Sequence, residues 1–291
     1  MEPKKTGLTL IEILVVLGII FLLTGMLIPA LSVVRNTARD AKQKAQFTTI
    51  ELGLSAFKND YGDYPPSSWT PQEFTGDYCG AQKLAEALLG WDLLGFHPNS
   101  AWRSDGLDAA GGVQAYDPAQ TRDVDGDGVP DSLNERKGPY LELATSDAFR
   151  LGNVSVLKPG LFDNTAPLNP DTFVICDVYG AIKVTHANGK PEKAGLPILY
   201  YKADASKKII EEIYNCNDND AIVQIKERAD GGGSLHPLGW PNNNFQFFYD
   251  YIRDPKISAR VWPYRPDSYI LISAGADGLY GTNDDIRNFG N

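Results

Sequence analysis

An uncharged run of 22 residues near the N-terminus, Ile13 to Val34, constrains the fold more than any other feature of this sequence. As a helix rising ~1.5 Å per residue, the run would extend roughly 33 Å, which matches the apolar thickness of a bilayer. Glu12 lies immediately before the run, and a carboxylate at that depth is costly unless it is paired. Glu12 is therefore a candidate functional residue, and the run is a candidate membrane span.

Two ordinary interpretations of this segment are open. Lys4 and Lys5 followed by an apolar run are typical of a secretory signal peptide. Against this, the run is too long, Glu12 stands where a signal peptide should be purely apolar, and no small-residue cleavage site follows. A plain membrane anchor is the second interpretation, and the two lysines would then keep the N-terminus cytoplasmic with the larger domain outside.

A third interpretation comes from the spacing of Gly7, Leu8, Thr9-Leu10-Ile11-Glu12 and Pro29. These residues resemble the type IV pilin and type II secretion pseudopilin family. The resemblance implies that Met1–Gly7 is a prepilin leader, which prepilin peptidase cuts after Gly7, and that Leu8 becomes the mature N-terminus, where the family usually has Phe. Glu12 and Pro29 match the family's glutamate and helix proline, which serve assembly.

The physical role of these residues can be argued independently. In a filament of packed helices, the N-terminal amine of one subunit could meet Glu12 of a neighbour, and each charge would neutralise the other. Pro29 removes a backbone hydrogen bond, so we expect the helix to bend or melt locally there.

Beyond Arg35 the helix is expected to continue to about residue 60 as an amphipathic stem. Four apolar residues recur at three- and four-residue spacings and share one face: Phe47, Ile50, Leu54 and Phe57. Asn59 to Pro66 then forms a strong stop signal. The predicted division is therefore a leader (1–7), an apolar assembly helix (8–34), a stem helix (35–60) and a globular domain (61–291).

Composition narrows the function. The net charge of −10 does not favour nucleic acid as a main partner, and the acidic residues gather in short clusters that suit hard cations. The three cysteines have no metal-binding spacing and allow one disulfide at most. No Ser/His/Asp, Cys/His or HExxH arrangement is present, so we do not expect an enzyme.

The first acidic cluster follows the pattern D-x-D-x-D-G-x-x-D, with Gly128 at the sixth position. Such alternating carboxylates, with a glycine at the turn, are typical of a Ca²⁺ loop. The expected terminal glutamate is one place late, and the segment is similar to the calcium loops of thrombospondin type 3 repeats. The alternative is a solvated turn. The candidate ligands are Asp123, Asp125, Asp127 and Asp131.

Four segments have strand character, and we also expect short helices at Ala81–Leu89 and around Lys207–Ile213. The strand candidates are Phe173–Val178, Ala181–Thr185, Pro197–Tyr201 and Tyr269–Ser273. After the last of them, Ser273 to Ile286 resembles the C-terminal loop of the major type II secretion pseudopilin, which binds a structural calcium. The resemblance implies ligands from Asp277 and from Asp284 or Asp285. A mobile acidic tail is the alternative.

These observations predict an α+β, pilin-like fold in which a long N-terminal helix packs on a small antiparallel sheet, with loop-rich insertions at about 66–165 and 202–262. The expected function is that of a calcium-stabilised structural subunit of a type II secretion pseudopilus or pilus-like filament. Its expected partners are copies of itself, other pilin-like subunits, prepilin peptidase and an inner-membrane assembly platform. A minor pilin or membrane-anchored adhesin is the alternative, and an anchored enzyme is a third.

Overall fold

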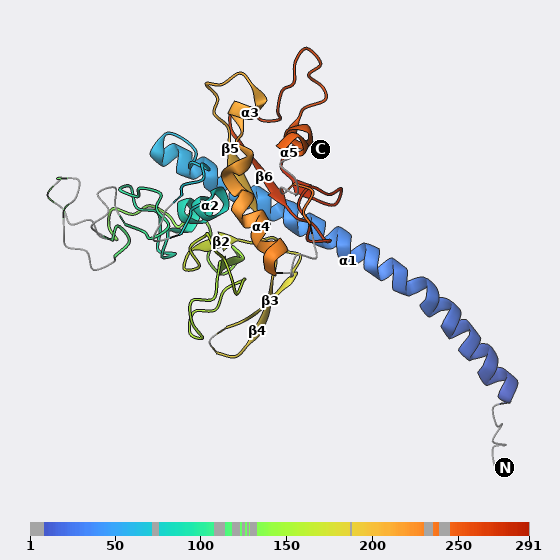
Figure 1. The fold of residues 1–291 in the computed structure, drawn as a ribbon. Coiled ribbons are helices and arrows are strands. Elements are labelled where there is room, and N and C mark those ends of the chain that lie inside the picture. The colour runs from blue at the N-terminus through green and yellow to red at the C-terminus, as the bar shows by residue number, and fades with distance from the viewer. Residues whose placement is uncertain are drawn as a thin grey trace. The chain divides into compact units, whose positions relative to one another are not determined.

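The computed structural model describes residues 9–71, 76–107, 114–117, 133–186, 188–229, 235–238 and 245–290, together with residues 123, 126 and 128. The chain divides into two compact units, residues 1–42 and residues 43–291, and the second is called the head below. The head combines helices with short antiparallel strands (Figure 1). This mixture agrees with the predicted α+β class.

The first helix, α1 (Leu10–Tyr61), has 52 residues and is helical without a break at Pro29. The expectation of local melting at this proline is therefore wrong, because the helix accommodates the loss of one backbone hydrogen bond. The helix ends at Tyr61. There the N–H of Gly62, at a φ of 85°, donates to the carbonyl of Lys58 over 2.7 Å.

The second half of α1 buries the apolar face that its spacing predicts. Phe47, Ile50, Leu54 and Phe57 are between 0% and 4% exposed. The first three belong to one core cluster with residues of α2 (Gly80–Leu89) and of the central sheet. Burying side chains of this size contributes ~1.5–3 kcal/mol each, so this face accounts for much of the attachment of α1 within the head.

Seven strands form three separate antiparallel sheets in the described part of the chain, rather than one sheet. Two are strand pairs, β1 (Ala148–Arg150) with β2 (Phe173–Ile175) and β3 (Ile182–Thr185) with β4 (Pro191–Ala194). The third has the order β5-β6-β7, from Leu199–Lys202, Tyr269–Ser273 and Ile286–Arg287. The four predicted strand segments each contain part of one of these strands, whereas β1, β4 and β7 were not predicted.

The central sheet is covered on both faces, because successive residues of a strand point to opposite sides. Tyr200 of β5 and Leu271 of β6 are paired in register and pack into the cluster that contains the α1 face. Their neighbours Tyr201 and Ile270 belong to the other main cluster, with residues of three further helices. All five residues of β6 are buried, so this strand lies at the centre of the head.

Those further helices correct the interpretation of residues 202–262 as a polar insertion with one short helix. The segment contains α3 (Ile210–Ile213), α4 (Asp220–Ala229) and α5 (Phe245–Ile252). It supplies core residues such as Ile213, Ile225 and Ile252. Helices α4 and α5 were not predicted because the sequence next to them is rich in glycine (Gly231–Gly233) and asparagine (Asn242–Asn244). Both helices cover the second face of the central sheet.

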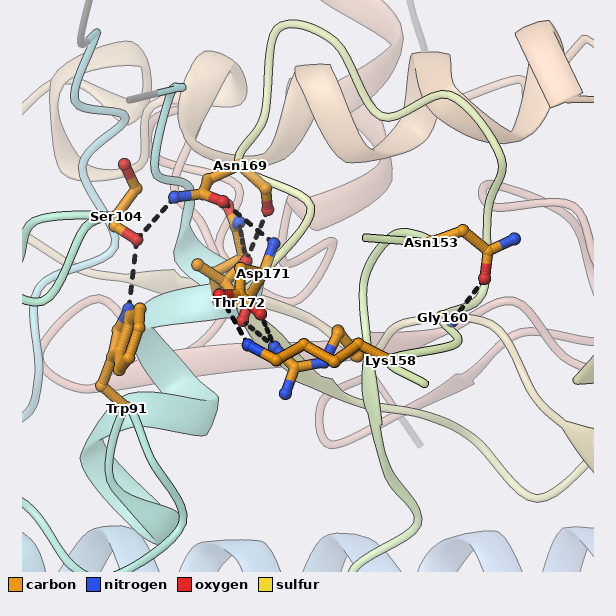
Figure 2. A network of polar contacts seen from close by, with 10 residues as sticks. Trp91, Ser104, Asn153, Lys158, Gly160, Asn169, Asp171 and Thr172 are labelled. Atoms are coloured by element: carbon orange, nitrogen blue, oxygen red, sulfur yellow. Dashed lines mark hydrogen bonds and ion pairs between the residues drawn. The ribbon is translucent and has the colours of Figure 1, made fainter. Parts of the chain in front are cut away.

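Side-chain hydrogen bonds add to the backbone pairing that holds the long loops between α2 and β2 (Figure 2). The carbonyl of Ser104 accepts from Trp91 Nε1 over 3.1 Å and from Asn169 Nδ2 over 2.9 Å. The carbonyl of Asn169 accepts from the Thr172 hydroxyl, and Asp171 forms an ion pair with Lys158. These bonds satisfy backbone groups that no strand or helix pairs.

No disulfide contributes to the head. Cys79 and Cys176 are buried and Cys216 is partly buried, and all three are free. The disulfide that the cysteine count allowed is therefore absent, and stability rests on three core clusters of buried apolar residues.

Leu54 and Leu52 provide a matched test of the α1 face, because Leu54 is fully buried and Leu52 is 66% exposed. We expect Leu54→Ala to lower the free energy of unfolding of the fragment 35–291 by ~2–5 kcal/mol, since it leaves a cavity in the core. Leu52→Ala should change it by less than ~0.5 kcal/mol. Urea denaturation followed by circular dichroism measures both, and equal effects would contradict the described packing.

Candidate functional site in the acidic loops and at the helix N-terminus

The C-terminal acidic loop connects β6 to β7 and spans residues 274–285. Gly275 and Gly281 have φ angles of 65° and 94°, which only glycine adopts without strain. A Cβ atom at Gly275 would lie 2.4 Å from the carbonyl oxygen of Asp284. The glycines therefore let the two ends of the loop approach each other closely.

This close approach brings together two of the predicted ligands. The N–H of Asp277 donates to Asp284 Oδ2 over 2.9 Å, and the Thr282 hydroxyl donates to Asp284 Oδ1. Asp277 is exposed, and its Oδ1 accepts from the N–H of Leu279 over 2.8 Å. The loop thus gathers carboxylate, hydroxyl and carbonyl oxygens, which are the ligand types that Ca²⁺ prefers.

Asp285 points elsewhere, although it follows Asp284 directly. Its side chain is 8% exposed and accepts from the Tyr251 hydroxyl of α5 and from the N–H of Gly281. Burial raises the pKa of Asp285 to about 6. Sequence reasoning left Asp284 and Asp285 as equivalent candidates, whereas the structure places Asp284 beside Asp277 and joins Asp285 to the core.

The first acidic loop is described only at Asp123, Gly126 and Gly128, so the candidates Asp125, Asp127 and Asp131 lie outside the described residues. Asp123 accepts from the N–H of Gly126 over 2.6 Å and from that of Gly128 over 2.8 Å. Both glycines have positive φ angles. Asp123 therefore folds the start of this segment into a tight turn.

The described residues contain no group of three or more His, Cys, Asp and Glu side chains arranged to hold a metal ion. In the C-terminal loop, Asp277 and Asp284 supply two carboxylates. Because Ca²⁺ takes six to eight oxygen ligands, backbone carbonyls and water would have to complete its shell. The donor chemistry of this loop fits a calcium ion, and the number of side-chain ligands is small.

Glu12 has a local role that its sequence position did not reveal. Its Oε2 accepts from the N–H of Thr9 over 2.7 Å and from the Thr9 hydroxyl over 2.8 Å. The N–H of Glu12 in turn donates to the Thr9 hydroxyl over 3.3 Å. This reciprocal pair is a capping box, which satisfies donors at the start of α1. The T-x-x-E spacing was the signal that could have identified it.

The apolar segment that follows is long and apolar enough to cross a membrane, over Leu10–Leu27. Its described side chains are exposed throughout. The processing candidates Gly7 and Leu8 lie outside the described residues, and nothing is described for the side chain of Pro29.

Asp177 is a polar core residue to which sequence reasoning assigned no role. It is 3% exposed, and its Oδ1 accepts from the N–H groups of Tyr179 and Leu196 over 3.1 and 3.2 Å. Its Oδ2 accepts from the hydroxyl of Ser273 at the end of β6. Burial raises the pKa of Asp177 to about 7. The carboxyl therefore fastens the segment after β2 to the start of the C-terminal loop.

Two glutamines of α1 bind the same segment. Gln43 Oε1 accepts from the N–H of Val178 over 3.0 Å, and Gln46 Nε2 donates to the carbonyl of Cys176 over 2.9 Å. Further along the helix, Glu51 accepts from Arg265 and from Asn288. Polar contacts thus connect α1 to the segment after β2 and to residues that precede and follow β6 in the chain.

Comparisons with protein-family models, with curated proteins and with solved structures found no significant match to the chain.

The raised pKa of Asp177 predicts a specific dependence of stability on pH. Native Asp177 keeps its proton up to about pH 7, whereas the unfolded carboxyl loses it near 3.8, so its contribution to stability falls as the pH rises between these values. Asp177→Asn cannot titrate but keeps an acceptor for both N–H groups. We expect the unfolding free energy of this variant relative to wild type to fall by ~2 kcal/mol between pH 7.5 and pH 5.

The control is Asp177→Ala, which removes the acceptor of two buried N–H groups. We expect it to destabilise the head at every pH, by ~1–3 kcal/mol for each unsatisfied donor. Urea titrations of the fragment 35–291 across this pH range measure both effects. A constant difference between Asp177→Asn and wild type would show that Asp177 does not titrate in the folded head.

Proposed function

We propose that this protein is a structural subunit of a type II secretion pseudopilus or type IV pilus-like filament. The observation that carries the proposal is the position of Glu12. This carboxylate lies in the first turn of an exposed apolar helix, five residues after Gly7. In this proposal, prepilin peptidase cleaves after Gly7, Leu8 becomes the N-terminus, and the helix polymerises.

The surface of α1 supports assembly through this helix. From Ile13 to Leu27 the helix is apolar around its whole circumference, so it needs lipid or other helices on every side. Beyond Gln43 it presents one apolar face, which the head itself covers. One helix therefore combines a segment that requires external partners with a segment that is already satisfied.

The proposed location and partners are those that the resemblance to the pilin and pseudopilin family implies. The subunit is inserted in the inner membrane with its head in the periplasm, and it then enters a periplasmic or extracellular filament. Its partners are copies of itself and other pilin-like subunits, together with prepilin peptidase and the inner-membrane assembly platform. The chain acts as a structural component and not as an enzyme.

A minor pilin or membrane-anchored adhesin is a second candidate. Besides the stem part of α1 and the three-stranded sheet, the head contains the helices α3 to α5 and long loops before β2. Such additional segments suit recognition of a partner. Copy number separates the two candidates, because a main filament subunit outnumbers the other pilin-like proteins of its cell.

Glu12→Gln distinguishes a role in assembly from a role in capping. Glutamine is accepted at this position of a capping box but carries no charge. If the charge of Glu12 pairs with the amine of a neighbouring subunit, the variant should yield few or no filaments while remaining helical and membrane-inserted. Electron microscopy of sheared filaments and cell fractionation measure these two properties.

Two controls complete this experiment. Thr9→Ala breaks the capping box but keeps the carboxylate, so we expect filaments to form. Gly7→Ala should leave the leader attached, which mass spectrometry of the N-terminus detects. Normal filaments from Glu12→Gln would exclude charge pairing, and a shortened mature chain from Gly7→Ala would exclude the proposed processing.

We further propose that the acidic loops bind Ca²⁺ as a structural ion. Asp277 and Asp284 would hold it in the C-terminal loop, and Asp123, Asp125, Asp127 and Asp131 would hold a second ion. When bound, the ion supplies positive charge that offsets the repulsion between neighbouring carboxylates. It would also stabilise the folded head by mass action, because the unfolded chain lacks the site.

Calcium dependence can be measured on the fragment 35–291. We expect saturating Ca²⁺ to raise its midpoint of thermal unfolding relative to EDTA, and Asp284→Asn to reduce that increase. Asp250→Asn is the matched control, because Asp250 is an exposed aspartate on α5, outside both loops. An unchanged midpoint in Ca²⁺ would count against both sites, and equal effects of the two variants would count against the C-terminal one.

A further inference from the structure

A groove of about 800 Å³ runs along β3 on the surface of the head. Residues 181–185 form one wall and residues 159–164 form the other, while Asn153, Asp277 and Gly278 complete the lining. The volume lies within the ~300–1,000 Å³ that is typical of ligand-binding clefts. The four residues of β3 extend ~13 Å at ~3.3 Å per residue, so the groove follows the full length of a strand.

The edge of β3 that faces this groove has no strand partner, because β3 pairs with β4 alone and none of the lining residues belongs to β4. Thr185 is opposite Pro191, which has no N–H, and at the next position the His186 N–H donates to the carbonyl of Lys190. Thr185 is therefore in a non-hydrogen-bonded pair, and alternation gives Lys183 the same status. The N–H and carbonyl groups of both residues point away from β4, toward the groove. They have no hydrogen-bond partner in the part of the chain that the structure describes.

The opposite wall is fixed in place by hydrogen bonds to the segment that follows β1. The N–H of Leu161 donates to the carbonyl of Arg150 over 2.9 Å, and the N–H of Gly160 donates to Asn153 Oδ1 over 2.7 Å (Figure 2). Phe162 is 4% exposed and belongs to a core cluster of the head. The groove is therefore preformed, so a ligand that enters it does not have to order this wall.

Backbone groups arranged in this way are suited to an extended peptide. A free strand edge offers donors and acceptors at the spacing of another strand, and peptide recognition by strand addition uses this match. Main-chain hydrogen bonds then supply affinity, whereas contacts of alternate side chains supply specificity. Two donors and two acceptors of β3 are available for such a peptide.

The charges beside this edge indicate which peptide fits. Lys183 and Lys193 lie directly opposite each other in β3 and β4, and both are exposed. Like charges at opposite positions destabilise a strand pair. Neither ammonium forms an ion pair with a described residue. A carboxylate on an added strand next to Lys183 would offset this repulsion, whereas a further lysine there would increase it.

The other side of the groove limits how many carboxylates the peptide can carry. Asp163 and Asp277 belong to the lining outside β3, and both are exposed. Asp163 Oδ1 accepts from Asn153 Nδ2 over 2.7 Å, which is a neutral donor. Further acidic side chains on the peptide would meet these carboxylates. A strand with a single carboxylate and uncharged neighbours therefore complements both walls.

We propose that the groove binds an extended segment of a partner protein, which adds to β3 as a third strand and places one carboxylate beside Lys183. The segment carries a single acidic residue among uncharged ones. Its side chains that share the face of Val184, which is 3% exposed, are apolar, and those that share the face of Lys183 are polar. Every residue that this proposal uses lies in the head, so it is independent of the proposed filament.

Fluorescence anisotropy of the full-length protein in detergent tests this proposal with the labelled pentapeptide Thr-Val-Glu-Val-Thr. The peptide should bind, and replacing its Glu by Lys should weaken binding by about tenfold or more, because two ammonium groups would then be adjacent. Lys183→Glu should reverse this preference. Lys190→Glu is the matched control, since Lys190 is an exposed lysine of the same hairpin that does not line the groove.

N-methylated peptides separate strand addition from attraction between charges alone. Alternate N–H groups of a strand point to opposite edges, so a methyl group on the Glu nitrogen and methyl groups on the two Val nitrogens block opposite edges. One of these two peptides should bind at least about tenfold more weakly than the other. Equal binding of both, or no binding of the unmodified peptide, would overturn the proposal.

A second copy of this chain is the competing occupant. Analytical ultracentrifugation of the peptide-free protein in detergent detects it as dimers or larger species. We expect the wild type and Lys183→Glu to sediment alike. Self-association that the pentapeptide reverses and that Lys183→Glu abolishes would show that a second copy fills the groove, and would contradict binding of a different partner.

Discussion

The helix α1 has to be stable in two different environments, and the rest of the structure depends on that constraint. Over Leu10–Leu27 it exposes apolar side chains on every side, whereas beyond Gln43 one face alone is apolar and that face is buried in the head. Helix propensity does not distinguish the two halves, because both form one continuous helix. The two segments differ in what covers their apolar side chains. Leu10–Leu27 needs lipid or other helices outside the head, whereas the segment beyond Gln43 is covered by the head and organises its core.

Polar contacts add to the apolar packing that holds α1 in the head. Gln43 and Gln46 bind backbone groups between Cys176 and Val178, and Glu51 receives Arg265 and Asn288. Each contact joins the helix to a segment outside the named strands. Since buried backbone groups must be satisfied, the contacts of Gln43 and Gln46 help the close-packed apolar face to fix the register of the helix in the head.

The parts of the fold that could be predicted from the sequence are those with a clear apolar pattern. The Phe47–Phe57 face was recognisable because its apolar residues repeat at the period of a helix, and the strand Tyr269–Ser273 because it is a short run rich in aromatic and aliphatic residues. The helices α4 and α5 were not recognised because each is short and borders a polar cluster. Asp284 and Asp285 could not be distinguished either, since the choice depends on Tyr251, which reaches this loop only through the tertiary fold.

The register of the central sheet has a consequence for the order in which the protein can form during synthesis. Strand β6 lies between β5, about 70 residues earlier in the chain, and β7, at the very end of it, while Asn288 reaches back to Glu51. The stem half of α1 therefore leaves the ribosome more than 200 residues before Leu271 and Asn288, which contact it in the folded head. Residues of α2, β2 and β5 can cover part of its apolar face earlier, and the covering is complete only after Tyr269 and Leu271 of β6 have been synthesised.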